Sequence, residues 1–163
     1  MRSWIGRFLA LAALPYAVVV AKPEQIRGVS SPIFHYYLQA SPQDPTIPVM
    51  GPEASSEYFN IANGAIQSAN SSAYLTVGTD STSYKTLTLS ASAGTPGWAL
   101  EGDTIITGTS SEWGRQLNFL VCKVGGSGSS GDDLWQVYLQ TGSDVPAGKT
   151  CSNYQSLHLP CLC

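Results

Sequence analysis

Short runs of apolar and β-branched residues, separated by turn residues, alternate along most of this chain. The alternation is clearest in Thr86-Leu87-Thr88-Leu89, where the leucines would face one side of a strand and the threonines the other. No segment has convincing helical periodicity, so the pattern is typical of an all-β fold. Similar runs predict strands over residues 33–38, 58–61, 65–66, 73–77, 84–89, 97–100, 104–106, 117–122, 134–139 and 154–159.

Two tight turns indicate how some of these strands are connected. Asn63-Gly64 is the strongest hairpin signal, because a two-residue type I′ turn needs positive φ at both positions, and Glu101-Gly102-Asp103 predicts a second turn. The segments 59–66 and 98–105 each combine an aromatic strand, a glycine turn and a strand start, which fits two units of a β-trefoil or simply two hairpins. Since no third unit is visible, we expect a single antiparallel β-sandwich or partly closed barrel, with a β-trefoil-like fold as the alternative.

Two further segments are placed by their composition. Residues 117–122 are apolar on both faces, so we expect them to form a central strand. Residues 41–56 contain four prolines, which lack the N–H group that a β-ladder needs. We therefore expect a loop or an edge strand there.

The N-terminus predicts export from the cell. Arg2 and Arg7 precede the apolar run Phe8–Ala21, which ends in small residues and is typical of a cleaved secretory signal peptide over residues 1–21. Because this run is broken by Pro15 and is shorter than the ~20 residues of a spanning helix, an uncleaved membrane anchor is the less favoured alternative. We expect residues 22–31 to form a mobile arm and residues 32–163 to form a single all-β domain.

Charge narrows the range of partners. The 163-residue chain has a formal net charge of −3, and removal of the signal with its two arginines leaves 142 residues with a net charge of −5. The few basic residues are scattered, so we expect no nucleic-acid partner and, after signal cleavage, no membrane partner. Few charges and abundant turn residues suit a secreted, extracellular β protein.

The four cysteines, Cys122, Cys151, Cys161 and Cys163, lie close to the C-terminus. In an oxidising compartment they allow three disulfide connectivities. We favour Cys122–Cys151, which closes a loop around the Gly/Ser-rich residues 125–131 and would stabilise the fold by roughly 3–4 kcal/mol. Cys161 and Cys163 are too close in sequence to pair without strain, so they bridge elsewhere, pair between chains or stay free.

The sequence contains no pattern typical of a metal site or of a catalytic serine nucleophile. His35 and His158 lie in predicted strands, where we expect them on the outer face, and neither has the spacing of a zinc ligand. Asp132-Asp133 lacks the ligand spacing of a calcium loop. The Gly/Ser-rich stretch 125–131 never matches the nucleophile elbow of a serine hydrolase. We therefore expect no metal and no cofactor.

Carbohydrate chemistry has more candidates. Glu101, Asp103 and Glu112 are the acidic residues flanked by strands and tryptophans, as the two carboxylates of a glycosidase would be. The turn already explains Glu101 and Asp103, so a glycan-cleaving enzyme is the least favoured reading and we expect no catalytic residues. Trp98 and Trp135 lie among aliphatic residues and are expected in the core, whereas Trp113, in a polar loop, is a candidate for stacking on a sugar.

Asn70-Ser71-Ser72 matches the acceptor sequence for N-glycosylation. It falls in a predicted turn between two strands, where a glycan can be accommodated. In an exported eukaryotic protein we expect Asn70 to be glycosylated.

Several motifs together resemble a family of small secreted fungal proteins, the IgE-binding or phialide cell-wall proteins. The most specific are Phe119-Leu120-Val121-Cys122, Trp135-Gln136-Val137-Tyr138 and Pro146-x-Gly148 followed by Cys151. Ser31-Pro32-Ile33 before an aromatic strand, the strand and turn over residues 59–64, and Gly97-Trp98 before an acidic-Gly turn add to the likeness.

The resemblance supports the Cys122–Cys151 bridge and implies a secreted or cell-wall-associated protein without established catalysis. The chain departs from the family in lacking an additional cysteine in its first half and in ending with Cys161-x-Cys163. We therefore expect a non-catalytic structural or surface-interaction protein. A carbohydrate-binding module for fungal wall polysaccharide is the alternative, and that polysaccharide is the candidate partner.

Overall fold

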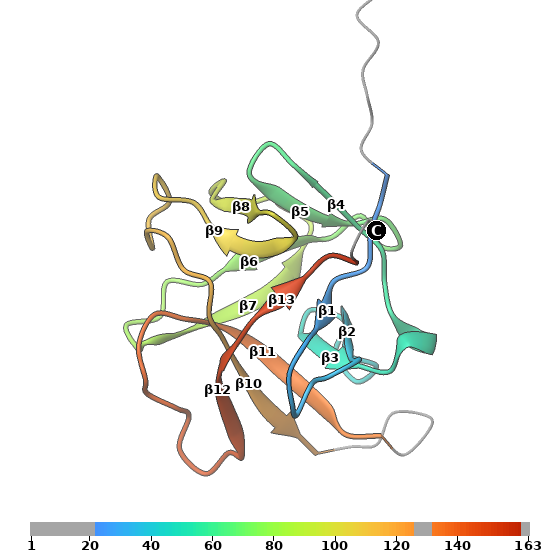
Figure 1. Cartoon of the computed structure of the whole chain (residues 1–163), viewed down its shortest axis with the longest axis vertical. Helices are drawn as coiled ribbons and strands as arrows, with labels where there is room; N and C mark the ends of the chain where they lie inside the picture. The colour runs from blue at the N-terminus through green and yellow to red at the C-terminus, as the bar shows by residue number, and fades with distance from the viewer. Residues whose placement is uncertain (1–21, 126–131, 161–163) are drawn as a thin grey trace, which may run out of the picture.

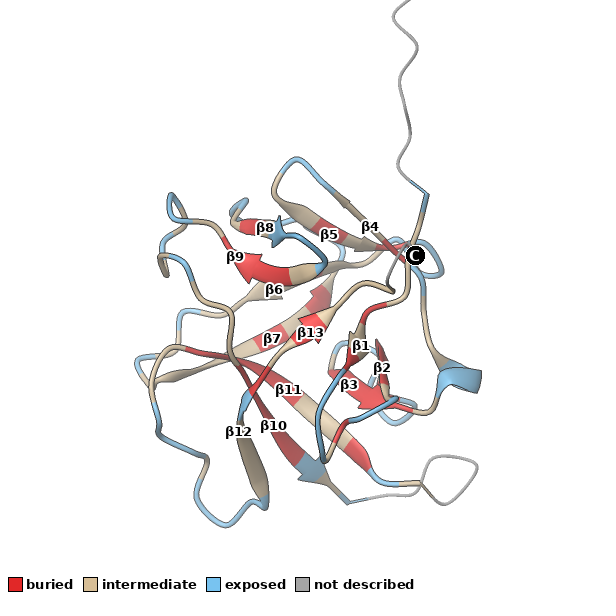
Figure 2. Ribbon diagram, viewed as in Figure 1, coloured by how far each residue is buried: buried red, intermediate tan, exposed pale blue. Residues whose placement is uncertain are grey.

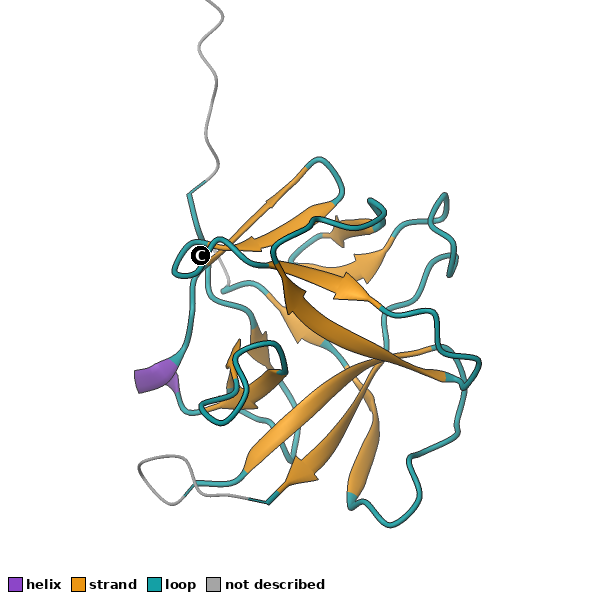
Figure 3. Ribbon diagram, turned by 180° about the vertical axis from the view of Figure 1, so that it is seen from behind, coloured by secondary structure: helices purple, strands orange, loops and turns teal. Residues whose placement is uncertain are grey.

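The computed structural model describes residues 22–125 and 132–160, and these are almost entirely strand and loop (Figures 1 and 3). The only helix among them is a single 3-10 turn, Glu53–Ser55. The expected all-β fold is confirmed, and the sheet nearly closes into a barrel. The strands are β1 (Arg27–Gly28), β2 (Tyr37–Ala40), β3 (Pro48–Gly51), β4 (Phe59–Ala62), β5 (Ala65–Ser68), β6 (Tyr74–Val77), β7 (Tyr84–Ser90), β8 (Trp98–Glu101), β9 (Thr104–Thr107), β10 (Phe119–Val124), β11 (Leu134–Gln140), β12 (Cys151–Gln155) and β13 (Leu157–His158).

The sheet follows the order β4-β5-β6-β7-β11-β3-β2-β1-β13-β9-β8, with β10 branching off β11 and carrying β12 on its other edge. All named strand pairs are antiparallel. Near the two ends of this order, the amides of Gly97 and Trp98 both donate to the carbonyl oxygen of Gly64 at 3.0 Å. These hydrogen bonds tie the start of β8 to the β4–β5 turn and bring the ends of the sheet together.

Both predicted hairpin turns are confirmed. Ala62 pairs with Ala65 across Asn63 and Gly64, whose φ angles of 53° and 76° are those of the two-residue turn that the sequence favours. Glu101 pairs with Thr104 across the second turn, where Gly102 has φ 63°.

The core forms where strand side chains of alternate residues meet inside the barrel. Figure 2 shows the buried stretches along the strands. Trp98 stacks on Phe119 with ring centroids 6.3 Å apart, and its indole N–H donates to the carbonyl of Leu75 at 2.8 Å. Phe119–Cys122 are all buried and β10 pairs on both edges, so the prediction of a central strand is confirmed. Trp135 is partly buried and packs against the same core.

The expected mobile arm over residues 22–31 is wrong for most of its length. Glu24 forms a β-bridge with Phe59, and β1 pairs with both β2 and β13. The physical reason is Ile26, which is only 1% exposed and anchors the segment in the core. A single apolar residue among polar neighbours gives no periodic pattern, so this strand could not be recognised from the sequence.

Two other expectations are corrected nearby. Residues 48–51, expected in a loop or at an edge, form β3, which pairs with β2 on one side and β11 on the other. Pro48 is tolerated because it is the first residue of the strand. His35, expected within a strand, lies in a turn with φ 61°, and regular pairing begins only at Tyr37.

Some expectations concern residues that the structure does not describe. The predicted signal peptide over residues 1–21, residues 126–131 of the Gly/Ser-rich stretch, and Cys161 and Cys163 all lie outside the described residues. In the described part of the chain, no helix is both long and apolar enough to cross a bilayer.

The close packing of β1 against the turn at Ile33 can be tested by substitution of Gly28. A Cβ atom there would collide with the carbonyl oxygen of Ile33 and lie 2.7 Å from the Ile33 side chain. We predict that Gly28→Ala lowers the free energy of unfolding by about 1–3 kcal/mol, the usual cost of overpacking. Urea denaturation of the secreted protein measures this. Gly108→Ala is the control, because its Cβ would meet nothing closer than 3.8 Å; equal midpoints for both variants would contradict the prediction.

Candidate functional site

The site that best matches the sequence candidates is an open hollow of about 320 Å³ beside Trp113, here called the Trp113 depression. Its walls come from the β6–β7 turn, the start of β7, the β9–β10 loop and the residue after β11. The lining residues are Gly78, Thr79, Asp80, Lys85, Glu112, Trp113 and Thr141.

Trp113 is held in place by a tightly bonded loop. Thr107 and Ser111 donate their hydroxyl groups to the carbonyl oxygen of Gly114 at 2.6 and 2.9 Å, and the side-chain Nε2 of Gln116 donates to the Trp113 carbonyl at 2.9 Å. Gly114 has φ 66°, which a residue without a side chain adopts readily. These bonds hold the backbone that carries the indole ring, and the ring itself packs in part against the core.

The Trp113 ring is half-buried rather than fully exposed. Part of it packs against the core, and a Cβ atom on Gly97 would lie only 3.0 Å from it. Another part lines the depression. The sugar-stacking role that the sequence suggests for Trp113 stays a prediction, and the ring is also a structural contact for Gly97.

The opposite wall carries fixed polar groups. The Asp80 carboxylate accepts hydrogen bonds from the Thr86 amide at 2.7 Å and the Thr86 hydroxyl at 3.1 Å. The Lys85 ammonium donates to the carbonyl oxygens of Asp80 and of Thr82, the latter at 2.7 Å. These bonds stabilise the β6–β7 turn and orient one carboxylate and one ammonium group at the depression.

The three candidate carboxylates have different surroundings. Glu112 is exposed and lines the Trp113 depression. Glu101 instead accepts two hydrogen bonds from the Arg115 guanidinium, from Nε at 2.7 Å and from Nη2 at 2.5 Å. Asp103 lies 3.3 Å from the imidazole Nδ1 of His158.

The environment of Glu101 is unlike that of a general acid. The hydrogen bond from Arg115 holds the pKa of the Glu101 carboxyl below its usual value, and the same contact raises the pKa of Arg115. A general acid in a glycosidase needs the opposite shift, so that it is protonated at working pH. Glu101 is suited to a surface ion pair.

The remaining polar candidates have structural partners. His158 lies in β13 as predicted, with Nδ1 3.3 Å from the Thr104 hydroxyl and Nε2 2.9 Å from the Ser156 hydroxyl. Asp133 forms an ion pair with Lys123 at 2.8 Å. In residues 22–125 and 132–160, no three His, Cys, Asp or Glu side chains are grouped as a metal site would require.

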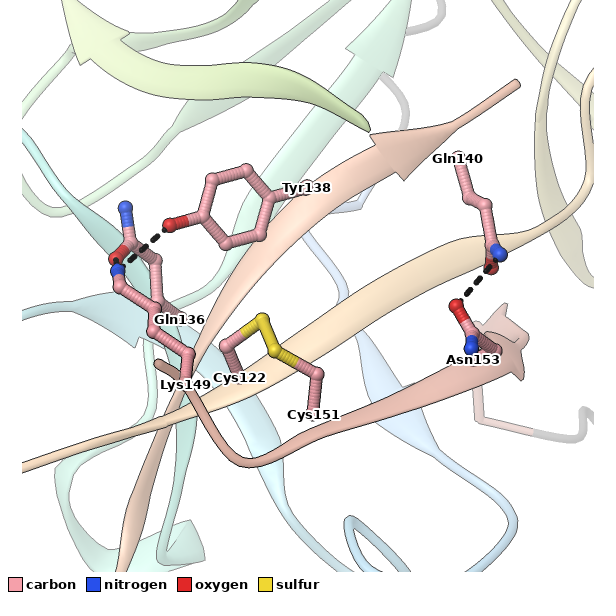
Figure 4. The surroundings of a disulfide bond; sticks show 7 residues. All are labelled: Cys122, Gln136, Tyr138, Gln140, Lys149, Cys151 and Asn153. Carbon is pink, nitrogen blue, oxygen red and sulfur yellow. Dashed lines mark hydrogen bonds between the residues drawn. A yellow bond between two sulfur atoms is a disulfide. The ribbon is translucent and has the colours of Figure 1, made fainter. Parts of the chain in front are cut away.

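The favoured disulfide is confirmed. Cys122 and Cys151 face each other across β10 and β12, with an S–S distance of 2.10 Å (Figure 4). On the same side of the sheet, the Lys149 ammonium donates to the Tyr138 hydroxyl at 3.0 Å and to the Gln136 side chain at 3.2 Å. These contacts fasten the β11–β12 loop, so this region is a structural brace rather than an open site.

Lys85, Asp80 and Thr141 were not singled out from the sequence. They lie in different strands and turns from Trp113, and only β7–β11 pairing brings Lys85 opposite Leu139, close to Thr141. No local motif marks them. The nearest signal is the turn composition around Gly78 and Asp80, which predicts a strand boundary and not a binding wall.

Comparison with known proteins found no relative of the chain. No protein-family model, curated protein or solved structure matches it. The binding chemistry of the Trp113 depression therefore has to be inferred from its own lining residues.

The Glu101–Arg115 pair provides a direct electrostatic test. We predict that NMR titration of the Glu101 side chain gives a pKa below the ~4.3 of an unperturbed glutamate, and that Arg115→Ala raises it. A lowered folded-state pKa means that the ionised pair favours the fold above the unfolded pKa, and that this contribution is lost as pH falls through the folded value. Lys123→Ala, which removes a different exposed cation, should leave the Glu101 pKa unchanged. Equal effects of the two substitutions would contradict the assignment.

Proposed function

We propose that this is a secreted, non-catalytic surface-interaction protein of the cell wall or extracellular space, and that it holds wall polysaccharide at the Trp113 depression. The observation that carries the proposal is a tryptophan ring, fixed by its own loop, beside an open hollow with oriented polar groups. The signal-like N-terminus and the resemblance to the fungal cell-wall proteins support an extracellular setting.

The lining residues suit a sugar. The apolar face of a pyranose ring stacks on an indole, while its hydroxyl groups both donate and accept hydrogen bonds. Asp80 and Glu112 supply acceptors, Lys85 supplies donors and the Thr141 hydroxyl supplies either. Sugar sites combine a flat apolar surface with a few placed polar groups in this way.

A binding role is favoured over cleavage by the state of the carboxylates. Glu101 is paired with Arg115, and both oxygens of Asp80 accept hydrogen bonds from Thr86. Arg115 holds the pKa of the Glu101 carboxyl below its usual value, the opposite of what a catalytic carboxylic acid needs. The proposal therefore assigns no catalytic residue.

We predict that Trp113→Ala weakens retention on chitin or on insoluble β-glucan by about tenfold, because a stacked ring contributes about 1–1.5 kcal/mol. Retention is measured by depletion of the protein from solution over a range of polymer concentrations. Tyr154→Ala is the matched control, since Tyr154 is 62% exposed but does not line the depression. Wild-type protein that binds neither polymer would leave a purely structural role, and loss of activity against wall polysaccharides in Glu112→Gln would instead indicate an enzyme.

We also infer that Asn70 carries an N-linked glycan when the protein is secreted from a glycosylating host. Asn70 is exposed in the turn between β5 and β6, and its side-chain oxygen accepts a hydrogen bond from the Tyr58 amide at 3.1 Å. The Ser68 hydroxyl holds the turn by accepting from the Asn70 and Ser71 amides. These hydrogen bonds use the side-chain oxygen and the backbone amide of Asn70 and not Nδ2, the atom that bears a glycan.

Mass spectrometry of the secreted protein tests whether Asn70 carries a glycan. Secreted wild-type protein should lose mass on treatment with a peptide N-glycosidase, and Asn70→Gln should already have the lower mass. Ser72→Ala, which leaves Asn70 in place but removes the acceptor sequence, should match Asn70→Gln. An unchanged mass after enzyme treatment would contradict the inference.

A further inference from the structure

A second hollow of about 320 Å³ lies on the outer face of β4, β5 and β6. It is here called the β5 groove and is lined by Asn60, Asn63, Gln67, Tyr74 and Pro96, with small alanines between them. It shares no lining residue with the Trp113 depression.

Strand alternation explains why the groove exists. Phe59, Ile66 and Leu75 turn inward to the core, so their neighbours in β4, β5 and β6 turn outward. Ala62 and Ala65 pair across the hairpin turn, and two methyl groups leave the floor of the groove low.

The wall of the groove is fixed rather than loose. Pro96 lies in the loop before β8, and the next two amides, those of Gly97 and Trp98, donate to the Gly64 carbonyl at 3.0 Å. Gly97 also lies under the Trp113 ring. One short segment therefore contributes to both hollows, Pro96 to the β5 groove and Gly97 to the support of Trp113.

The polar groups of the groove are all uncharged. The side chains of Asn60 and Asn63 make no hydrogen bond within the described residues, and neither does the Tyr74 hydroxyl. Gln67 donates its Nε2 to the Ser72 carbonyl at 3.0 Å, which leaves its side-chain oxygen available. Carboxamides offer a donor and an acceptor side by side, the pattern that adjacent sugar hydroxyls present in return.

From this chemistry we propose that the β5 groove is a second carbohydrate subsite, which takes a neutral hexose unit of a polysaccharide. Tyr74 supplies the ring surface, and the amides of Asn60, Asn63 and Gln67 bind the hydroxyls. No lining residue is charged, so an acidic sugar gains no ionic partner there. A volume of about 320 Å³ is at the lower end for ligand pockets, which suits one or two sugar units.

The inference deepens the proposed function and rests on it in one respect, since both sites would contact the same class of polymer. Two subsites on one rigid domain raise the retention on an insoluble polymer above that of either alone, because the second contact is made at high effective concentration. The separate lining residues allow each subsite to be removed without the other.

The experiment measures binding of a soluble neutral hexasaccharide, a β-1,3-linked glucose hexamer, by titration calorimetry. Tyr74→Ala is expected to weaken binding at least tenfold, both in the wild-type background and in Trp113→Ala. Because Tyr74 is half-buried, Ala65→Leu is the second variant: it fills the groove floor without removing a side chain and should give the same loss. Tyr154→Ala is the control for a general effect of removing a tyrosine, and circular dichroism checks that each variant is folded.

The outcomes separate the two proposals. Loss in Tyr74→Ala and Ala65→Leu with binding retained by Tyr154→Ala supports the groove. If only Trp113→Ala loses binding, the Trp113 depression stands and the β5 groove is overturned. If the groove variants lose binding while Trp113→Ala does not, the groove stands and the depression is overturned. Equal binding of a galacturonate hexamer, lost in the same groove variants, would overturn the assignment to neutral sugars.

Discussion

Pairing of β11 along both of its edges is the constraint on which the rest of the structure depends. One edge is paired with β10 along its whole length, and the other is divided between β3 and β7. Through β3 it carries β2 and β1, through β7 it carries β6, β5 and β4, and through β10 it carries β12. Both hollows lie on strands or loops that this branch point positions, so their geometry depends on contacts far from either one.

The predictable part of the fold is the part with local determinants. The Asn63-Gly64 turn and the apolar run Phe119–Cys122 carry their own conformational preferences, and both form as expected. β1 and β3 were missed for the opposite reason. Ile26 is flanked by polar residues that give no strand pattern, and Pro48 lies in a proline-rich segment that predicts a loop or an edge strand. Their strands form because partners from distant parts of the chain pair with them.

The candidate site also has features that local sequence predicts and features that depend on distant residues. Trp113 could be recognised because a tryptophan in a polar loop is locally unusual. Its partial burial could not, because it depends on the missing side chain of Gly97. The pairing of Glu101 with Arg115 could not be predicted either, since Glu101 ends β8 and Arg115 lies 14 residues later, in the loop between β9 and β10.

The two hollows differ in charge. This difference limits the kinds of polymer that could bind in both hollows at once. At the Trp113 depression, Asp80 and Glu112 would accept hydrogen bonds from the hydroxyls of the proposed sugar but would repel a carboxylate. Lys85 is the one cation in that lining, and two of its three donors already bind backbone carbonyls. The β5 groove has no charge to offer. A protein whose acidic residues outnumber its basic ones adds a general repulsion for polyanions. A neutral glycan would meet neither repulsion, whereas an acidic wall polymer would meet both and would find no cation in the β5 groove.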